Sequence, residues 1–148
     1  LEKVKISAAL ALDFTYGLYY SPLHNSGSFS DIQLDLPSCT NFTSSFMSQA
    51  PGGRNSTTYI PTIGMSAVTN MTNTFLGVPR LRRMKATGIG VSFSLKDCSL
   101  SSTALDEVYT NLADLTGLTG ATITVTSNPG VTQDTPSIAT SKNWTVTG

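Results

Sequence analysis

Short stretches in which apolar and polar residues alternate recur along this chain. Ile32-Gln-Leu34-Asp-Leu36 is the clearest of them, and a period of two predicts a short strand with one buried face. Each such stretch is followed by a turn rich in Ser, Thr and Asn, and then by a returning segment anchored on Leu or an aromatic residue. The pattern therefore predicts a strand and a return segment that are used several times.

One return segment has a helical pattern. Ser101, Ser102 and Thr103 offer an N-cap, and Gly117 and Gly120 end the pattern. Between them the apolar residues follow at helical spacing: Leu105, Val108, Tyr109, Leu112 and Leu115.

The alternating stretches recur at a fixed offset. Thr40-Asn-Phe-Thr43-Ser-Ser-Phe46 is repeated 29 residues later as Thr69-Asn-Met-Thr72-Asn-Thr-Phe75. Matching apolar positions continue at steps of about 30 residues in both directions. Because one such unit cannot bury its own apolar face, neighbouring units must stack. The expected inward columns are Val4, Leu34, Ile63, Phe93 and Ile123, and beside them Ile6, Leu36, Met65, Leu95 and Val125.

This repeat predicts an α/β solenoid of the leucine-rich-repeat type, with a parallel sheet and short helical or irregular return segments. About five coils are expected, near residues 4–30, 31–59, 60–89, 90–120 and 121–148. At 148 residues the chain is the size of one domain. Since it opens on Leu1 and enters a strand directly, we expect it to be the C-terminal part of a longer protein. Ser21–Gly27 and Gln49–Thr58 are rich in turn residues and are expected to form loops.

The repeated residues resemble the BspA-like branch of the leucine-rich repeats, from about Asp31 to Asn128. The Thr-Asn-[Phe/Met]-Thr-x-x-Phe motif is the most specific part of the resemblance, and Ala9 and Val68 depart from the Asn or Cys usual at the turn. The stretch from Tyr109 and the final Trp144-Thr-Val-Thr-Gly148 look like the C-terminal cap of such domains in structural proteins of tailed phages. The resemblance implies adhesion or display rather than chemistry, by analogy of fold.

The charge content makes two classes of partner poor candidates. Only 12% of the residues are charged, and nine basic and nine acidic residues give a formal net charge of zero. Without a long-range field the chain has little to attract nucleic acid or an anionic membrane. No apolar run approaches the roughly 20 residues that cross a bilayer, so membrane insertion is not expected.

Catalytic chemistry finds little support, and we expect neither an enzyme nor a cofactor. The single histidine, His24, lies in a turn-like stretch and is expected to be an exposed loop residue. Asp106 and Glu107 are adjacent on the expected helix and so point apart. Asp31, Asp35 and Asp97 fit strand-surface polar groups better than a calcium site, and Gly88-Ile-Gly90 is too short for a phosphate loop.

The two cysteines occupy equivalent places in the repeat. Cys39 and Cys98 are two units apart, which would separate their Cα atoms by roughly 10 Å, beyond the ~7 Å limit for a disulfide. We therefore expect both thiols to be reduced and buried, and no metal site to form around them.

Two segments are candidates for a contact surface. The only concentration of charge comprises Arg80, Arg82, Arg83 and Lys85, which suits either a solvated face or an anion-binding patch. Arg54 and Asn55 lie in the second expected loop. Asn41, Asn55, Asn70 and Asn143 begin glycosylation sequons, which chance and turn chemistry explain better than glycosylation does. Trp144 is expected to cover the last unit.

The favoured functional hypothesis is a structural protein of a bacteriophage virion, in the tail, a fibre or a capsid decoration. Its surface would serve host attachment or subunit contact. The expected partners are other virion subunits or an upstream domain against the first unit, together with a host-surface glycan or protein, and an oligomer within an assembly is expected. The alternatives are a bacterial cell-surface adhesion domain and an accessory carbohydrate-binding module.

Overall fold

In the computed structural model of the chain, residues 3–17, 31–46 and 59–148 are described. Seven strands and two helices lie in these ranges. They are β1 (Lys3–Ser7), β2 (Asp31–Asp35), β3 (Tyr59–Gly64), β4 (Arg83–Thr87), β5 (Phe93–Ser94), α1 (Ser102–Asn111), β6 (Ala121–Thr124), α2 (Ser137–Thr140) and β7 (Trp144–Thr147).

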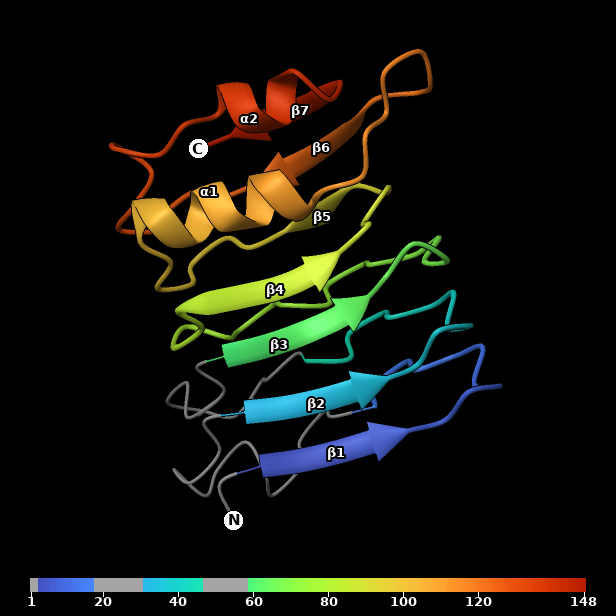
Figure 1. The fold of residues 1–148 in the computed structure, drawn as a ribbon. Helices are drawn as coiled ribbons and strands as arrows, with labels where there is room; N and C mark the ends of the chain where they lie inside the picture. The colour runs from blue at the N-terminus through green and yellow to red at the C-terminus, as the bar shows by residue number, and fades with distance from the viewer. Residues whose placement is uncertain (1–2, 18–30, 47–58) are drawn as a thin grey trace.

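The described strands are parallel and fall into three small sheets. β1 pairs with β2, β3 with β4, and β5, β6 and β7 form a sheet in that order. Figure 1 shows β1 to β4 side by side, with the two helices at the C-terminal end of the molecule. The chain is thus a small α/β domain.

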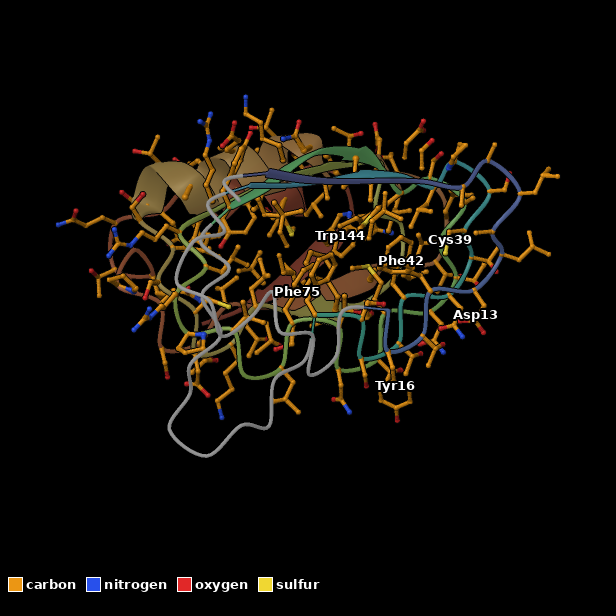
Figure 2. The ribbon with its side chains drawn as sticks, turned by 90° about the horizontal axis from the view of Figure 1, so that it is seen from below. Asp13, Tyr16, Cys39, Phe42, Phe75 and Trp144 are labelled. Carbon is orange, nitrogen blue, oxygen red and sulfur yellow. The ribbon has the colours of Figure 1, made fainter. Side chains whose placement is uncertain are left out.

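Two layers of backbone enclose the core. The layer opposite β1 to β4 contains short segments in which Asp13, Asn41 and Asn70 form successive parallel bridges, and it also contains the sheet of β5, β6 and β7. In Figure 2 Phe42, Phe75 and Trp144 lie between the layers. All three are at most 3% exposed.

The predicted five-coil solenoid with one continuous parallel sheet is wrong. The strands are divided among three separate sheets. The constant step of about 30 residues fails within the second of them, where Tyr59 pairs with Arg83, 24 residues later. Ile63 was expected beside Phe93, but it pairs with Ala86, because β4 lies against β3. Phe93 belongs to the opposite layer, where it pairs with Ile123 as predicted.

The strand that breaks the predicted register is β4, which the sequence analysis treated as a charged surface segment. Its burial alternates: Met84 and Ala86 are at most 2% exposed, whereas Arg83 is exposed and Lys85 and Thr87 are half-buried. The period of two was therefore present, but cations occupy the outward positions and conceal it.

The pairing of β1 with β2 differs from the prediction by two residues. Ile6 lies opposite Leu34 rather than Leu36, and Val4 lies opposite Ile32. A slip of two residues leaves each side chain on the same face of a sheet, so the apolar pattern cannot detect it.

The helix α1 follows its sequence signals. Ser101 is the N-cap, and its side chain accepts a hydrogen bond from the backbone N–H of Ala104 at 3.3 Å. Leu105, Val108 and Tyr109 are buried on one face. The helix ends at Asn111, although the apolar pattern continues to Leu115, because Leu112 is already extended with ψ 149°.

A buried asparagine joins two strand ends near the C-terminus. Asn128 is 6% exposed. Its side-chain Oδ1 accepts from the N–H of Leu100 at 2.9 Å, and Nδ2 donates to the carbonyls of Leu95 and Val125, both at 2.8 Å. One side chain thus satisfies three backbone groups from two successive strands and the start of the α1 segment.

Candidate binding cleft

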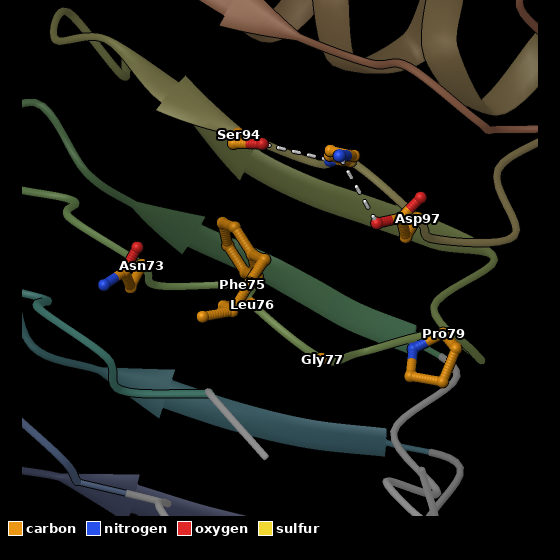
Figure 3. A pocket seen from close by; sticks show the side chains of 8 residues that line it. Asn73, Phe75, Leu76, Gly77, Pro79, Ser94 and Asp97 are labelled. Carbon is orange, nitrogen blue, oxygen red and sulfur yellow. Dashed lines mark hydrogen bonds and ion pairs between the residues drawn. The ribbon is translucent and has the colours of Figure 1, made fainter. Parts of the chain in front are cut away.

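A cleft opens between two segments of the layer that lies opposite β1 to β4. It has a volume of about 480 Å³. One wall is formed by Asn73, Phe75, Leu76, Gly77 and Pro79, and the other by Ser94, Lys96 and Asp97 (Figure 3).

The cleft exists because the two walls are not paired. Residues 70–74 accept backbone hydrogen bonds from residues 42–46, and residues 95–97 donate theirs to residues 124–126. In the part of the chain that the structure describes, no backbone hydrogen bond joins residues 71–77 to residues 92–97. The walls converge only at Ser99, whose N–H donates to Leu81 at 2.8 Å and whose hydroxyl donates to Pro79 at 2.6 Å.

The floor and one wall of the cleft are apolar. Phe75 is 1% exposed and lies edge-on to Phe93, with the ring centroids 6.3 Å apart. Leu76 is 50% exposed and stands at the rim. Gly77, which lies in the same wall, has φ +73°, a left-handed backbone conformation that suits glycine.

Polar groups stand on both rims. Asn73 and Asp97 both adopt left-handed backbone conformations, with φ +53° and +59°, which asparagine and aspartate tolerate better than most residues. The carboxylate of Asp97 lies 4.0 Å from the ammonium of Lys96, and both side chains are more than half exposed. An exposed pair at this distance contributes little, so both charges can interact with a bound molecule.

The cleft continues as a shallower hollow of about 260 Å³ across β5 and β6. This hollow shares Asn73 and Ser94 with the cleft and reaches Thr122 and Thr124. The two together form a groove with hydroxyl and amide groups along its rim.

The predicted contact residues are only partly brought together. Arg54, Asn55 and His24 lie outside the described residues. Arg83 makes a two-pronged ion pair with Glu107, at 2.6 and 2.9 Å, and Lys85 approaches the same carboxylate at 3.8 Å. The guanidinium also lies 5.8 Å from the ring centroid of Tyr59.

This ion pair changes the prediction for the basic segment. The hydrogen bond from Arg83 lowers the pKa of Glu107 and raises that of the arginine. The carboxylate of Glu107 faces both Arg83 and Lys85. Of the four cations in this segment, Arg80 and Arg82 are exposed and form no ion pair with another described residue. The segment is thus largely a strand surface.

The candidate calcium ligands do not converge. Asp35 accepts a hydrogen bond from the Ser7 hydroxyl at 3.0 Å, whereas Asp97 lies in a turn at the cleft. Asp106 accepts from Thr135, and Glu107 faces β4, so the two point apart as expected. Among the described residues, no group of three or more His, Cys, Asp or Glu side chains could hold a metal ion.

Both cysteines are free and buried, as predicted. Burial raises the pKa of Cys98 to about 12, and the negative charge of Asp97 adds to the effect. Burial also raises the pKa of the Cys39 thiol.

Native Cys39 and Cys98 should therefore resist thiol reagents at pH 8. The thiolate is the reactive form, and a raised pKa keeps both groups protonated. We expect labelling of Cys98 by a chromogenic disulfide to be slower by about a hundredfold or more in the native protein than after unfolding in guanidinium, because a pKa of about 12 leaves very little thiolate. Labelling of Cys39 should also be slower in the native protein, since burial raises its pKa. Rapid labelling of either cysteine without denaturant would contradict the burial.

Sequence reasoning missed the cleft as a site. Asn73 and Asp97 were noted for other reasons, and their shared left-handed backbone has no unambiguous sequence signal.

No helix in the described ranges is long and apolar enough to cross a membrane. No protein-family model matches the chain, and neither do curated proteins or solved structures.

Proposed function

We propose that this chain is a non-enzymatic attachment domain of a bacteriophage virion, and that the cleft binds a saccharide of the host surface. The observation that supports a saccharide as the ligand is the cleft itself, which has a volume of about 480 Å³. In it an apolar wall at Leu76 and Pro79 faces Ser94 and Asp97. The virion is proposed from the resemblance of the C-terminal stretch to caps of phage structural proteins.

The chemistry of a sugar suits the two kinds of wall. A pyranose ring has C–H faces that pack on apolar side chains and hydroxyls that donate to carboxylates and accept from amides. Binding sites of this size are mostly apolar, with a few polar groups that fix orientation. Asp97 supplies an acceptor, Lys96 a donor, and Asn73 and Ser94 supply both. The hollow that continues over β5 and β6 has room for a further sugar unit.

The same cleft would serve a bacterial adhesion domain or an accessory carbohydrate-binding module. These differ from the favoured function in the particle or enzyme that carries the domain, not in the ligand. Immunogold labelling of purified particles of the encoding phage separates them, because only a virion component is found on the particle.

Saccharide binding is tested with an array of oligosaccharides from bacterial capsules and lipopolysaccharides, followed by calorimetric titration of the best binder. We expect Asp97→Asn to raise the Kd about tenfold or more, because a hydrogen bond to a charged acceptor contributes roughly 1.5–3 kcal/mol. Asparagine retains tolerance for the left-handed backbone at this position, so the variant should fold normally. Leu76→Ala should also weaken binding.

The matched control is Leu118→Ala. Leu118 is 66% exposed and does not line the cleft, so its removal should leave the Kd unchanged. Equal binding by the wild type and the Asp97 variant, or no saccharide bound anywhere on the array, would contradict the proposal.

A further inference from the structure

Residues 12–16 form the outer backbone edge of the layer opposite β1 to β4. Their hydrogen-bonding groups are arranged like those of the next segment, or unit, of this layer. Phe14 and Tyr16 donate their N–H groups to the carbonyls of Asn41 and Thr43, at 2.8 and 3.1 Å. Asp13 lies in a single bridge and residues 15–17 form a turn, so the direction of its other backbone groups is inferred from the equivalent inner segment, where the carbonyls of Asn41 and Thr43 point toward the preceding unit. The backbone groups of Asp13 and Thr15 therefore point away from the next unit, toward the outside of the molecule.

Three successive units share this edge. The N–H of Thr15 is bonded to the Asp13 carboxylate, just as Thr43 is bonded to the side chain of Asn41 and Thr72 to that of Asn70. The carbonyls of Asn70 and Thr72 likewise accept from the preceding unit, at 2.9 Å. Asp13 and Thr15 thus present two carbonyls arranged like those that their inner counterparts use for pairing.

The opposite end of the same layer presents donors. The N–H of Val125 donates to Thr147 at 2.7 Å, and Thr122 and Thr124 lie opposite Thr145 and Thr147. Because the directions of backbone groups alternate along the strand β7, Thr145 and Thr147 face β6, and the N–H groups of Val146 and Gly148 face outward. In the described parts of the chain no strand pairs with the outer edge of β7 or with that of residues 12–16.

We propose that copies of this chain associate head to tail, with β7 of one copy pairing in parallel with residues 13–15 of the next. Val146 and Gly148 would donate to the carbonyls of Asp13 and Thr15, as Phe14 and Tyr16 donate to the next unit inside the molecule. This register places Thr145 opposite Asp13 and Thr147 opposite Thr15. It needs no rearrangement, since every described strand pairing is already parallel.

The side chains agree with this register. Thr145 and Asp13 are both exposed, whereas Val146 and Phe14 are both half-buried and pack against the core. Leu10 and Leu12, 88% and 63% exposed, lie beside the same end, and an exposed strand edge next to apolar side chains is a ready site for pairing with another chain. Because the two contacting surfaces are different, the association is open-ended and gives rows rather than closed pairs.

Cysteine cross-linking tests the proposed register. Asp13→Cys and Thr145→Cys proteins are prepared separately, mixed and oxidised gently. Partners in adjacent strands lie about 5 Å apart, within the range for a disulfide. We expect this mixture to give about tenfold more cross-linked heterodimer than a mixture of Asp13→Cys with Thr147→Cys. In that control the two residues are offset by two positions, so their Cα atoms would lie about 8 Å apart. The native cysteines are buried and should not contribute.

A second variant tests the hydrogen bonds themselves. Val146→Pro removes an outward N–H without touching the groups of Thr145 and Thr147 that face β6, and proline is tolerated on an edge strand. We expect it to weaken self-association about tenfold in sedimentation equilibrium, since one hydrogen bond contributes about 1 kcal/mol and proline also hinders close approach. Its thermal unfolding shows whether the fold is kept.

The outcomes separate this proposal from saccharide binding. Matched-pair cross-linking, together with weaker association of Val146→Pro, supports head-to-tail pairing whether or not the cleft binds a sugar. Efficient cross-linking of Asp13→Cys with itself would show a symmetric contact and overturn the proposal. A protein that stays monomeric at millimolar concentration, with no excess of the matched product, would also overturn it.

Discussion

Replacing Asn128 with alanine is expected to lower the free energy of unfolding by at least about 2 kcal/mol, because each buried polar group left without a partner costs roughly 1–3 kcal/mol. The side chain is 6% exposed and bonds the N–H of Leu100 and the carbonyls of Leu95 and Val125. Alanine would leave the N–H of Leu100 and the carbonyl of Leu95 without this partner where water has little access, whereas the carbonyl of Val125 still accepts from the backbone N–H of residue 128 at 3.3 Å.

Urea unfolding followed by circular dichroism measures this loss. Thr132→Ala is the control, because Thr132 is exposed on the turn that follows and its side chain makes no hydrogen bond found in the described structure. That variant should stay within about 0.5 kcal/mol of the wild type. A loss below about 1 kcal/mol for the Asn128 variant would mean that water replaces the amide and that the three bonds are not essential.

Phe42→Ala should be at least as damaging, with a loss of about 3–5 kcal/mol. Phe42 is fully buried, and its ring centroid lies 5.7 Å from that of Phe14. Truncation removes the transfer free energy of the ring and leaves a cavity between the two layers, where the paired backbone on either side restricts collapse.

The same unfolding measurement applies, with Phe42→Leu as the comparison. Leucine retains most of the volume, so it should cost less than half as much as alanine. If the two substitutions destabilise the protein equally, the tilted ring contact with Phe14 rather than packing volume determines the stability at this position.

Sequence patterns predicted the elements whose buried face is uninterrupted. The helix at Leu105, Val108 and Tyr109 and the pairing of Phe93 with Ile123 follow directly from apolar spacing. The burial of Cys39 and Cys98 followed from their shared place among apolar residues.

The errors have two physical causes. Arg83 and Lys85 occupy the outward positions of β4, so a strand was interpreted as a charged surface segment. An even-numbered shift in register keeps every side chain on its face, so the pairing of Ile6 with Leu34 could not be distinguished from a pairing with Leu36.

The cleft could not be predicted because it results from a missing interaction. The residues near Asn73 and near Ser94 give no sign that the two backbones do not pair with each other. Their sequence patterns are similar to those of segments that do pair. Only the three-dimensional arrangement places Leu76 opposite Asp97.

The parallel pairing also has a consequence for how the chain folds while it is being made. Within the described ranges, the hydrogen bonds of longest reach, such as those from Asn128 to Leu95 and from Lys142 to Tyr109, span 33 residues. Each new element can therefore complete its contacts with the one synthesised just before it, and no early segment must wait for the far end of the chain. A ribosome moving at about 5–20 residues per second supplies such a partner within a few seconds, so the strand edges that pair within the described parts of the chain are exposed only briefly during synthesis.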